Sequence, residues 1–375
     1  MSHIKFMKFI DCHVGRLLCR MVPLASVPAW NCLGSILIIR PGGIGDAVLL
    51  ASMVRILLEV HPDCRIDILA EERNAAVFSL SSAYHTVYRY NTLSGLFSVL
   101  RNRYDVVIDT EQWYHLSAVV ARMVRAPVKI GFATNARRRM FTDCVQYDSG
   151  AYEPDNFQAL LKPLGVDCQP DVTAVTLTVP IQAVSTVSQL LQSHGLESFV
   201  AVFPGASTPE KRWGADSFRH VVETLSALGI KIVVVGGKED RQQGEVIAGG
   251  GLGLNLAGLT SLAETAAVIQ RSTLLLSGDS GVLHIAAGLG VPTVSLFGPG
   301  RAKKWAPRGD RHIVLNKELP CSPCTVFGNT PPCPHNIRCM SDITVDEVVN
   351  AVTMLLTAVG KRPSGCCKRD WIEAV

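Results

Sequence analysis

The sequence predicts an α/β protein built from two doubly wound domains, and two observations support this. Short apolar runs such as SILIIR (35–40) and KIVVVGG (231–237) alternate with amphipathic helical segments. This alternation is typical of a parallel sheet that is covered by helices on both faces. The alternation also stops at 162–174 and restarts near 199, and 375 residues are enough for two domains.

Each half of the chain contributes its own set of elements. In the first half, we expect strands at 35–40, 65–70, 86–90 and 105–110, and helices at 47–60 and near 74, 94 and 116. In the second half, we expect strands at 199–203, 231–237, 272–278 and 292–297, and helices at 216–228, from 240, through 287 and at 344–359. We therefore divide the chain into an amphipathic segment with linker (1–33), a first domain (34–175), a second domain (176–342), a C-terminal helix (343–360) and a loose tail (361–375).

The composition narrows the class of protein. Hydrophobic residues make up 48% and charged residues 18%, as expected for large globular cores. The net charge of +4 is too small to indicate nucleic-acid binding, and no nucleic-acid-binding motif is found. No uninterrupted apolar run is long enough for a membrane-spanning helix. The twelve cysteines are unevenly spaced and no signal peptide precedes them, so we expect reduced thiols in a cytoplasm.

The first thirty residues predict an amphipathic helix. Its apolar residues recur at helical spacing, and Lys5, Lys8, Arg16 and Arg20 outnumber Asp11. Two interpretations remain open. The helix packs on its own domain, or it lies on an anionic membrane surface.

Three loops of the second half carry groups that suit a phosphate or a ribose. PGASTPEKRWG (204–214) follows a strand and offers Ser207 and Thr208 as hydrogen-bond donors and Lys211 as a positive charge. GGKEDRQQ (236–243) offers Asp240, or Glu239 as second choice, for ribose hydroxyls, although these acids could simply favour a helix N-terminus.

The third loop begins at Ser277 and opens a helix. Asp279 precedes Ser280 and Gly281, whose free backbone N–H groups form a site for an anion, and His284 lies one turn further on. A core or capping histidine is the ordinary alternative for His284.

The first half instead contains a glycine loop with an acid and a run of arginines. In PGGIGD (41–46), Asp46 occupies the start of a helix, where an N-cap would be the simplest role. The run at 121–141 includes Arg122, Arg137 and Arg138, which suit an acceptor with carboxylates or phosphates, or else form a solvated basic face.

Four segments in this order resemble glycosyltransferase family 9, whose best-known members are the ADP-heptose:lipopolysaccharide heptosyltransferases. They are RPGGIGDAVLL (40–50), PGASTPEKRWG (204–214), GGKEDR (236–241) and GDSGVLHIAAGLGVPTVSLFGP (278–299), and the resemblance spans roughly 35–359. It implies a GT-B fold, with two Rossmann-like domains that face a central cleft. The first domain would bind the acceptor and the second the sugar nucleotide.

The resemblance also implies a reaction and its partners. The reaction is an inverting, metal-independent transfer of heptose from ADP-heptose, without a cofactor, to the lipid-linked inner core of lipopolysaccharide. The enzyme would be cytoplasmic and peripheral on the inner face of the bacterial inner membrane.

Residue by residue, the family pattern gives roles to the loops described above. Asp46 matches the base that takes the proton of the acceptor hydroxyl, and Gly42, Gly43 and Gly45 would let the acceptor approach the backbone. Ser207 and Lys211 match the phosphate-binding residues and Asp240 the ribose-binding acid. Asp279, Gly281 and His284 match the donor loop. Ala206 and Ser280 depart from the family pattern, which leaves the identity of the sugar open.

Four further cysteines, Cys321, Cys324, Cys333 and Cys339, lie close together in the sequence near His335. A zinc site, a disulfide and free thiols remain open for them.

Rival functions also remain open: a GT-B transferase of another nucleotide sugar, an epimerase, a dinucleotide-dependent dehydrogenase or a non-catalytic nucleotide-sugar-binding protein. Against the dehydrogenase, GGIGD is not the G-x-G-x-x-G fingerprint.

Overall fold

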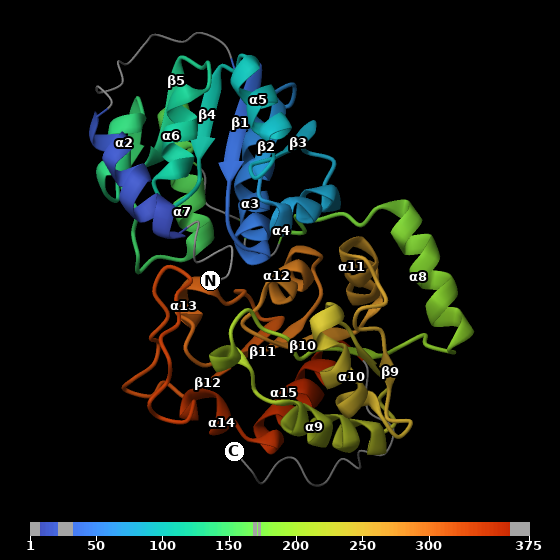
Figure 1. Cartoon of the computed structure of the whole chain (residues 1–375). Coiled ribbons are helices and arrows are strands. Elements are labelled where there is room, and N and C mark those ends of the chain that lie inside the picture. Colours follow the sequence, from blue (N-terminus) through green and yellow to red (C-terminus); the bar gives the residue numbers. More distant parts are fainter. Residues whose placement is uncertain (1–7, 22–32, 168–170, 172–173, 361–375) are drawn as a thin grey trace. The chain divides into compact units, whose positions relative to one another are not determined.

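The computed structural model describes residues 8–21, 33–167, 171 and 174–360. The chain divides into two compact units, Met1–Thr178 and Val179–Val375, which are described separately (Figure 1). The division falls three residues after the expected boundary at 175. The predicted tail (361–375) and the linker at 22–32 lie outside the described residues.

The first unit contains a parallel sheet of six strands in the order β3-β2-β1-β4-β5-β6. The strands are β1 (Ser35–Arg40), β2 (Arg65–Ala70), β3 (Thr86–Arg89), β4 (Val106–Asp109), β5 (Val128–Phe132) and β6 (Asp143–Val145). Residues 36–39 of β1 are apolar and fully buried because the sheet is covered on both faces. The strand order reverses between β1 and β4, which is the topological switch point of this sheet.

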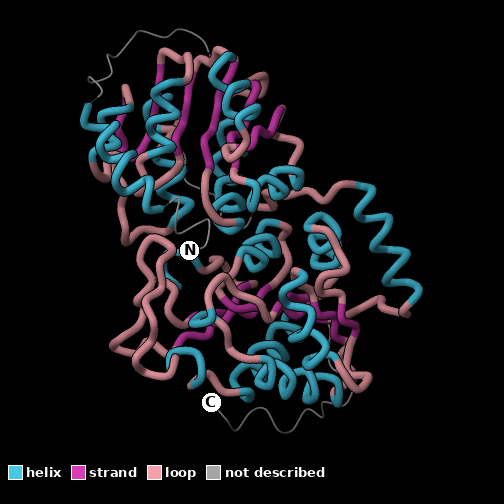
Figure 2. Tube along the Cα trace, in the orientation of Figure 1, coloured by secondary structure: helices cyan, strands magenta, loops and turns pink. Residues whose placement is uncertain are grey.

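Helices form a layer on each side of this sheet (Figure 2). The helices are η1 (a π-helix, Asp11–Gly15), α2 (Arg16–Met21), α3 (Ile44–Val60), α4 (Glu72–Ala75), α5 (Leu93–Arg101), α6 (Leu116–Met123) and α7 (Glu153–Ala159), with 3-10 turns η2 (Ala76–Leu80), η3 (Ala136–Met140) and η4 (Lys162–Leu164). Helices α2, α5 and α6 share one core with alternate residues of β1, including Leu37 and Ile39. Helix α3 packs with α7.

Two expectations for the first unit need correction. The helix after β1 begins at Ile44, with Gly43 as its N-cap, so Asp46 lies in the first turn rather than at the start. The N-terminal segment is not separate from the first domain, because Cys19 of α2 is fully buried in the core of this unit. This helix thus packs on the first unit through Cys19, whereas its contact with a membrane surface stays a prediction.

The second unit repeats the same topology. Its parallel sheet has the order β12-β11-β10-β7-β8-β9, with the switch point between β7 and β10. The strands are β7 (Val200–Phe203), β8 (Ile232–Val234), β9 (Leu254–Asn255), β10 (Leu274–Gly278), β11 (Thr293–Phe297) and β12 (His312–Asn316). The helices are α8 (Ile181–Ser193), α9 (Ala215–Ala227), α10 (Arg241–Ala248), α11 (Leu262–Arg271), α12 (Gly281–Gly288), α13 (Ala302–Trp305), α14 (Arg338–Ser341) and α15 (Val345–Ala358), with 3-10 turns η5 (Pro209–Lys211) and η6 (Lys238–Asp240).

The fold class is the GT-B type expected, with two Rossmann-like units. Four strands, β5, β6, β9 and β12, were not anticipated. Strand β5 lies inside the segment that the sequence analysis interpreted as a basic run, and it buries Lys129. Burial, reinforced by the nearby Arg122, lowers the pKa of Lys129 to about 8. Among the described residues, no helix combines the length and the hydropathy that crossing a membrane requires.

Candidate active site

Both sheets carry functional groups at the carboxyl ends of the strands that flank the switch point. In the first unit, Asp46 follows β1 and Asp109 ends β4. In the second unit, Lys211 lies in the loop after β7, and Asp279 follows β10 directly. Ligands of doubly wound sheets bind outside the carboxyl ends of the strands at this point. Each unit therefore has one candidate binding edge.

Asp46 is a partly exposed carboxylate in the first turn of α3. Among the described residues it makes no hydrogen bond or ion pair, and Gly43 occupies the N-cap position in its place. Gly42 has a φ of +116°, and a Cβ there would lie 2.9 Å from Nη2 of Arg40 and 3.7 Å from Oδ2 of Asp46. Gly42 thus allows a turn that would be strained with any other residue. Because the Asp46 carboxylate has no partner among the described residues, it can accept a proton from a ligand.

A network of buried charges lies beside this loop, and sequence reasoning missed it. Arg40 Nη2 lies 3.2 Å from Oε2 of Glu111, and Arg137 Nη2 lies 2.6 Å from Oδ2 of Asp109. All four side chains are buried. Burial raises the pKa of Glu111, while Arg40 and Arg137 oppose that rise. The two ion pairs connect the ends of β1 and β4 to the 3-10 turn η3.

A second polar group extends this network. The Tyr147 hydroxyl donates to Glu153 Oε2 at 2.9 Å, and Gln112 Nε2 donates to Glu153 Oε1 at 2.5 Å. Burial first, and then Glu153, raises the pKa of Tyr147, and the carboxylate of Asp46 adds to the rise. The phenol therefore stays protonated near Asp46 and keeps its donor role.

The arginines expected to bind an acceptor divide into two kinds. Arg137 is fully buried, is paired with Asp109 and donates to the carbonyl of Glu111, so it belongs to the interior and not to a binding surface. Arg138 is exposed and Arg122 is partly exposed. Only these last two of the predicted arginines present their charge to solvent.

In the second unit, the structure brings two predicted donor-binding residues together. Lys211 Nζ lies 2.6 Å from Oδ2 of Asp279, and both side chains are mostly buried. Gly300, in the loop after β11, lies against the same carboxylate, because a Cβ at Gly300 would overlap Asp279 Oδ2. Three loops thus converge on one charged pair.

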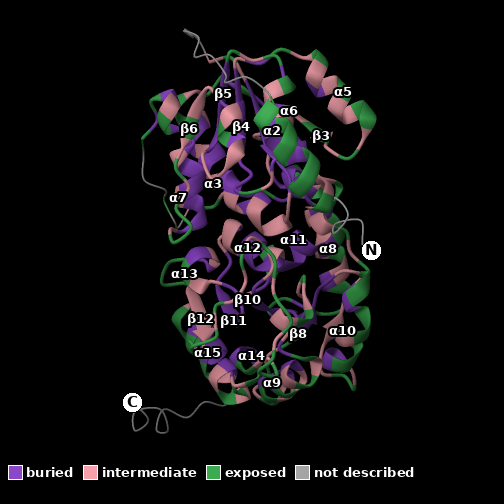
Figure 3. Cartoon of the chain, turned by 60° about the vertical axis from the view of Figure 1, so that its left-hand side comes forward, coloured by how far each residue is buried: buried purple, intermediate pink, exposed green. Residues whose placement is uncertain are grey.

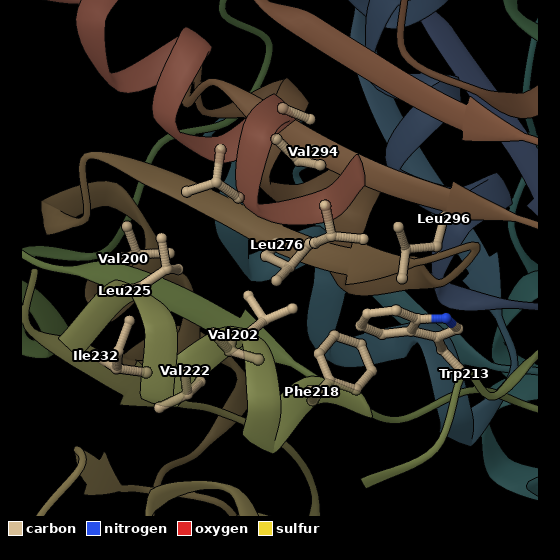
Figure 4. Packing of buried hydrophobic residues seen from close by; sticks show 14 of the residues in the cluster. Val200, Val202, Trp213, Phe218, Val222, Leu225, Ile232, Leu276, Val294 and Leu296 are labelled. Atoms are coloured by element: carbon tan, nitrogen blue, oxygen red, sulfur yellow. The ribbon is translucent and has the colours of Figure 1, made fainter. Parts of the chain in front are cut away.

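Trp213 attaches the Lys211 loop to the core of the second unit. Its indole Nε1 donates to the carbonyl of Ile343 at 3.0 Å. Its ring packs edge-on against Phe218, with centroids 5.2 Å apart, in the buried cluster that also contains Val202 and Leu276 (Figure 4). This anchoring limits how far the loop can move, so the position of Lys211 is set by a buried residue two positions away.

The hydroxyl groups of the predicted donor-binding loops differ in their burial and in their hydrogen bonds. Thr208 Oγ1 is buried and has no hydrogen-bond partner among the described residues, whereas Ser207 is exposed. Ser280 is the N-cap of α12, since its hydroxyl accepts from the backbone N–H of Leu283 at 3.2 Å. Gly281 therefore opens the helix as expected, and His284 is buried one turn later.

The Asp240 carboxylate forms a hydrogen bond within its own loop. Its Oδ2 accepts from the backbone N–H of Gly237 at 2.9 Å, and a Cβ at Gly205 would lie 2.5 Å from its Oδ1. The side chain is buried, and burial raises its pKa. Glu239, the second choice, is exposed beside it. The geometry thus makes Glu239 the more accessible acid for a ribose.

The four clustered cysteines do not form a closed site. Cys321, Cys324, Cys333 and Cys339 are free thiols. In the described part of the chain, no three or more histidine, cysteine or acidic side chains come together as metal ligands. The structure therefore shows free thiols here, and the zinc alternative stays untested.

Comparison with known proteins shows which protein family this chain resembles. Residues 95–333 match the family model described as glycosyltransferase family 9 (heptosyltransferase). Lipopolysaccharide heptosyltransferase 3 of Escherichia coli is 29% identical over 293 residues, which cover 72% of this chain and 85% of that protein. Lipooligosaccharide heptosyltransferase 2 of Haemophilus influenzae is 24% identical over 305 residues, covering 75% and 88%.

Solved structures support the fold. A glycosyltransferase of family 9 from Veillonella parvula superposes with a TM-score of 0.73 at 23% identity, covering 87% of this chain and 97% of that one. The Escherichia coli ADP-heptose lipopolysaccharide heptosyltransferase II superposes with a TM-score of 0.69 at 22% identity, covering 86% and 99%.

Proposed function

Because the chain belongs to glycosyltransferase family 9, the heptosyltransferase family, we propose that it transfers a heptose from ADP-heptose to the inner core of lipopolysaccharide. The observation that carries this proposal is the pairing of Lys211 with Asp279 at the switch point of the second sheet. A lysine at this place offers a positive charge to a diphosphate, as a nucleotide-sugar donor requires. The choice of acceptor follows the two relatives named above, which are a lipopolysaccharide and a lipooligosaccharide heptosyltransferase.

The donor in this proposal is held by the second unit. Lys211 and the N-terminus of α12 at Gly281 bind the diphosphate, and Thr208 and Ser207 donate hydrogen bonds to its oxygens. Glu239 or Asp240 accepts from the ribose hydroxyls. Asp279 keeps Lys211 oriented, and His284 supports α12 from within.

The reaction is a single displacement with inversion. The acceptor hydroxyl attacks the anomeric carbon, and a new carbon–oxygen bond forms as the bond to the diphosphate breaks. Asp46 takes the hydroxyl proton, and ADP leaves with the electron pair of the broken bond. The charge that develops on ADP is balanced by Lys211 and by the dipole of α12, so the proposed reaction needs no metal.

The acceptor in this proposal is a lipid-linked core oligosaccharide. Gly42, Gly43 and Gly45 allow its sugar to approach the backbone, and Arg122 and Arg138 attract its carboxylates or phosphates. Because such an acceptor is anchored in a lipid leaflet, the enzyme in this proposal works at the inner face of the bacterial inner membrane.

Mass spectrometry of the lipopolysaccharide core from cells that lack this protein tests the proposal. We expect a core truncated at a heptose, restored by a plasmid that encodes the parent chain. An intact core would refute heptose transfer. If the core is shortened by a different sugar, the alternative of another nucleotide-sugar donor replaces the proposal. Loss of core in cells that carry an Asp46→Asn chain would further exclude a non-catalytic nucleotide-sugar-binding role.

A further inference from the structure

We propose that the outward side of the N-terminal helix, residues 8–21, is a docking surface for an anionic lipid membrane. The inference specifies how the enzyme reaches the lipid-linked acceptor of the proposed function, and it rests on that function only for its biological setting.

The helix is attached through one side only. Asp11, Gly15 and Cys19, spaced four residues apart, are buried against the first unit. The carboxylate of Asp11 accepts the backbone N–H groups of His115 at 2.7 Å and Leu116 at 2.6 Å, and it thereby caps the start of α6. Since this contact bridges 104 positions in the sequence, the helix has a defined orientation on the domain.

The opposite side of the helix exposes large apolar side chains. Met21 is 72% exposed and Leu17 is 56% exposed. The other exposed apolar residues of this helix are Phe9, Val14 and Leu18. The spacing of three and four residues among 14, 17, 18 and 21 places them along one stripe. A contiguous exposed apolar stripe is uncommon on a protein that works alone in water, and it marks a surface that binds a partner or a membrane.

Basic residues border this apolar stripe. Arg16 and Arg20 lie four residues apart on the same side of the helix and are both exposed, and Lys8 lies over the ring of Tyr114. Neither Arg16 nor Arg20 forms an ion pair with any described residue. Apolar side chains flanked by arginines are typical of a helix that lies in the plane of an anionic interface.

The charges favour a membrane over a second copy of this chain. Two copies that met through this surface would gather the Arg16 and Arg20 side chains of both copies at one interface, where like charges repel. An anionic lipid surface complements those arginines while its acyl region takes up Leu17 and Met21.

A second helix of the first unit carries a similar set of exposed side chains. Helices α2, α6 and α5 lie on one side of the first sheet, and α2 and α5 present exposed residues there (Figure 3). On α5, Leu93 is 89% exposed and Phe97 is also exposed, with the guanidinium of Arg101 4.6 Å from the Phe97 ring centroid. This second helix repeats the combination of exposed apolar and basic side chains.

Co-sedimentation of the full chain with vesicles tests the proposal without donor or acceptor. We expect binding to vesicles of phosphatidylglycerol and phosphatidylethanolamine, weak binding to phosphatidylcholine alone, and loss of binding in high salt. The double variant Leu17→Glu/Met21→Glu should reduce partitioning by about tenfold or more. Arg16→Glu/Arg20→Glu should also reduce it by about tenfold or more.

The matched control is Ile181→Glu/Met354→Glu on the second unit, where the two side chains are 73% and 60% exposed. This control should bind vesicles like the parent. Truncation of the helix is a poorer test, because it would remove Asp11 and uncap α6. Thermal melting of each variant verifies that it folds.

Three results would overturn the proposal: a parent chain that does not bind anionic vesicles, a Leu17→Glu/Met21→Glu variant that binds like the parent, or a dimer of the parent that this variant dissociates. Because vesicle binding requires no sugar transfer, a failure here is distinct from a failure of the proposed function. In that case transfer to a soluble acceptor would persist.

Discussion

Lys211 Nζ lies 2.6 Å from Oδ2 of Asp279, and this ion pair joins the loops that follow two neighbouring strands at the switch point of the second sheet. The two residues are 68 positions apart in the sequence. Because both side chains are mostly buried, each charge depends on the other until a ligand arrives. A diphosphate bound there would contact the Lys211 ammonium group together with Asp279. The ion pair therefore holds this ammonium group in position for an anion.

Lys211→Ala should weaken ADP binding by about ten- to a hundredfold, since a charge-assisted hydrogen bond contributes roughly 1.5–3 kcal/mol. Isothermal calorimetry measures this affinity. Lys231→Ala is the control, because Lys231 is exposed, lies before β8 and donates to the carbonyl of Gly195. Unchanged ADP affinity in Lys211→Ala would remove this lysine from the site.

Gly300→Ala should weaken ADP binding without altering any side chain that carries charge. The added methyl group would overlap the Asp279 carboxylate and displace it from Lys211. We expect a loss of about threefold to thirtyfold in affinity, within the cost of overpacking. Gly328→Ala, whose Cβ would meet nothing within 4 Å, is the calorimetric control for the added methyl group, although its φ of +67° strains the backbone. If the Gly300→Ala variant binds ADP as tightly as the parent, ADP binding does not depend on the position of the Asp279 carboxylate.

Asp46→Asn should abolish most sugar transfer while it leaves stability and ADP binding unchanged. Asparagine keeps the shape of the side chain but cannot accept the proton, and loss of a general base costs about 10²–10⁴ in rate. Because Gly43 is the N-cap of α3, the substitution removes no capping bond. A coupled assay for ADP release measures the rate, with Asp63→Asn in the exposed loop after α3 as control. Transfer above about a tenth of the parent rate would place the base elsewhere.

Arg137→Met should destabilise the first unit by about 3–5 kcal/mol, because it leaves the carboxylate of Asp109 buried without its partner. Urea unfolding, followed by circular dichroism, measures the change. The double variant Asp109→Asn/Arg137→Met should recover part of the loss, because no charge is then left unpaired. If the single variant has the same free energy of unfolding as the parent, the Arg137–Asp109 ion pair does not stabilise the first unit, and water must solvate the Asp109 carboxylate.

The stability contributed by His312 should decline as the pH falls. Burial, with Arg311 adding to the effect, lowers the pKa of His312 from 6.5 to about 4, and its Nδ1 lies 2.9 Å from Oγ1 of Thr293. The folded state therefore favours the neutral ring. Its contribution is complete above about pH 6.5 and is lost progressively toward pH 4, because the unfolded chain binds the proton first.

Urea unfolding of the parent and of His312→Gln at pH 7, 5.5 and 4.5 measures this effect. The difference in free energy of unfolding should shrink at each step downward. His220→Gln, at an exposed position of α9, is the control. A difference that is constant across the three pH values would contradict the expected linkage.

Much of the architecture was predictable because it depends on local pattern. Continuous apolar runs such as residues 35–40 indicate buried parallel strands, and glycine-rich loops mark their carboxyl ends. The long C-terminal helix was recognisable from its amphipathic spacing, and the structure adds a capping box of Thr344 and Glu347 at the start of α15. The loops with Asp46, Lys211 and Asp279 could likewise be identified as candidate sites from the residues that follow each strand.

Other features could not be predicted, since they depend on partners distant in the sequence. The sequence favoured an exposed position for Arg137 within a basic run. Arg137 instead pairs with Asp109 in the core, because only the fold brings this residue of η3 next to the end of β4. The same holds for Asp11, which caps a helix more than a hundred residues away. This contact holds the N-terminal helix on the first unit, and the apolar stripe of the helix therefore faces outward. The sequence thus determined which residues could form strands, helices and charged loops, because these follow from local spacing. The tertiary structure alone decided which charges are paired and buried and which remain available to a ligand, because burial and pairing depend on contacts between segments far apart in the chain.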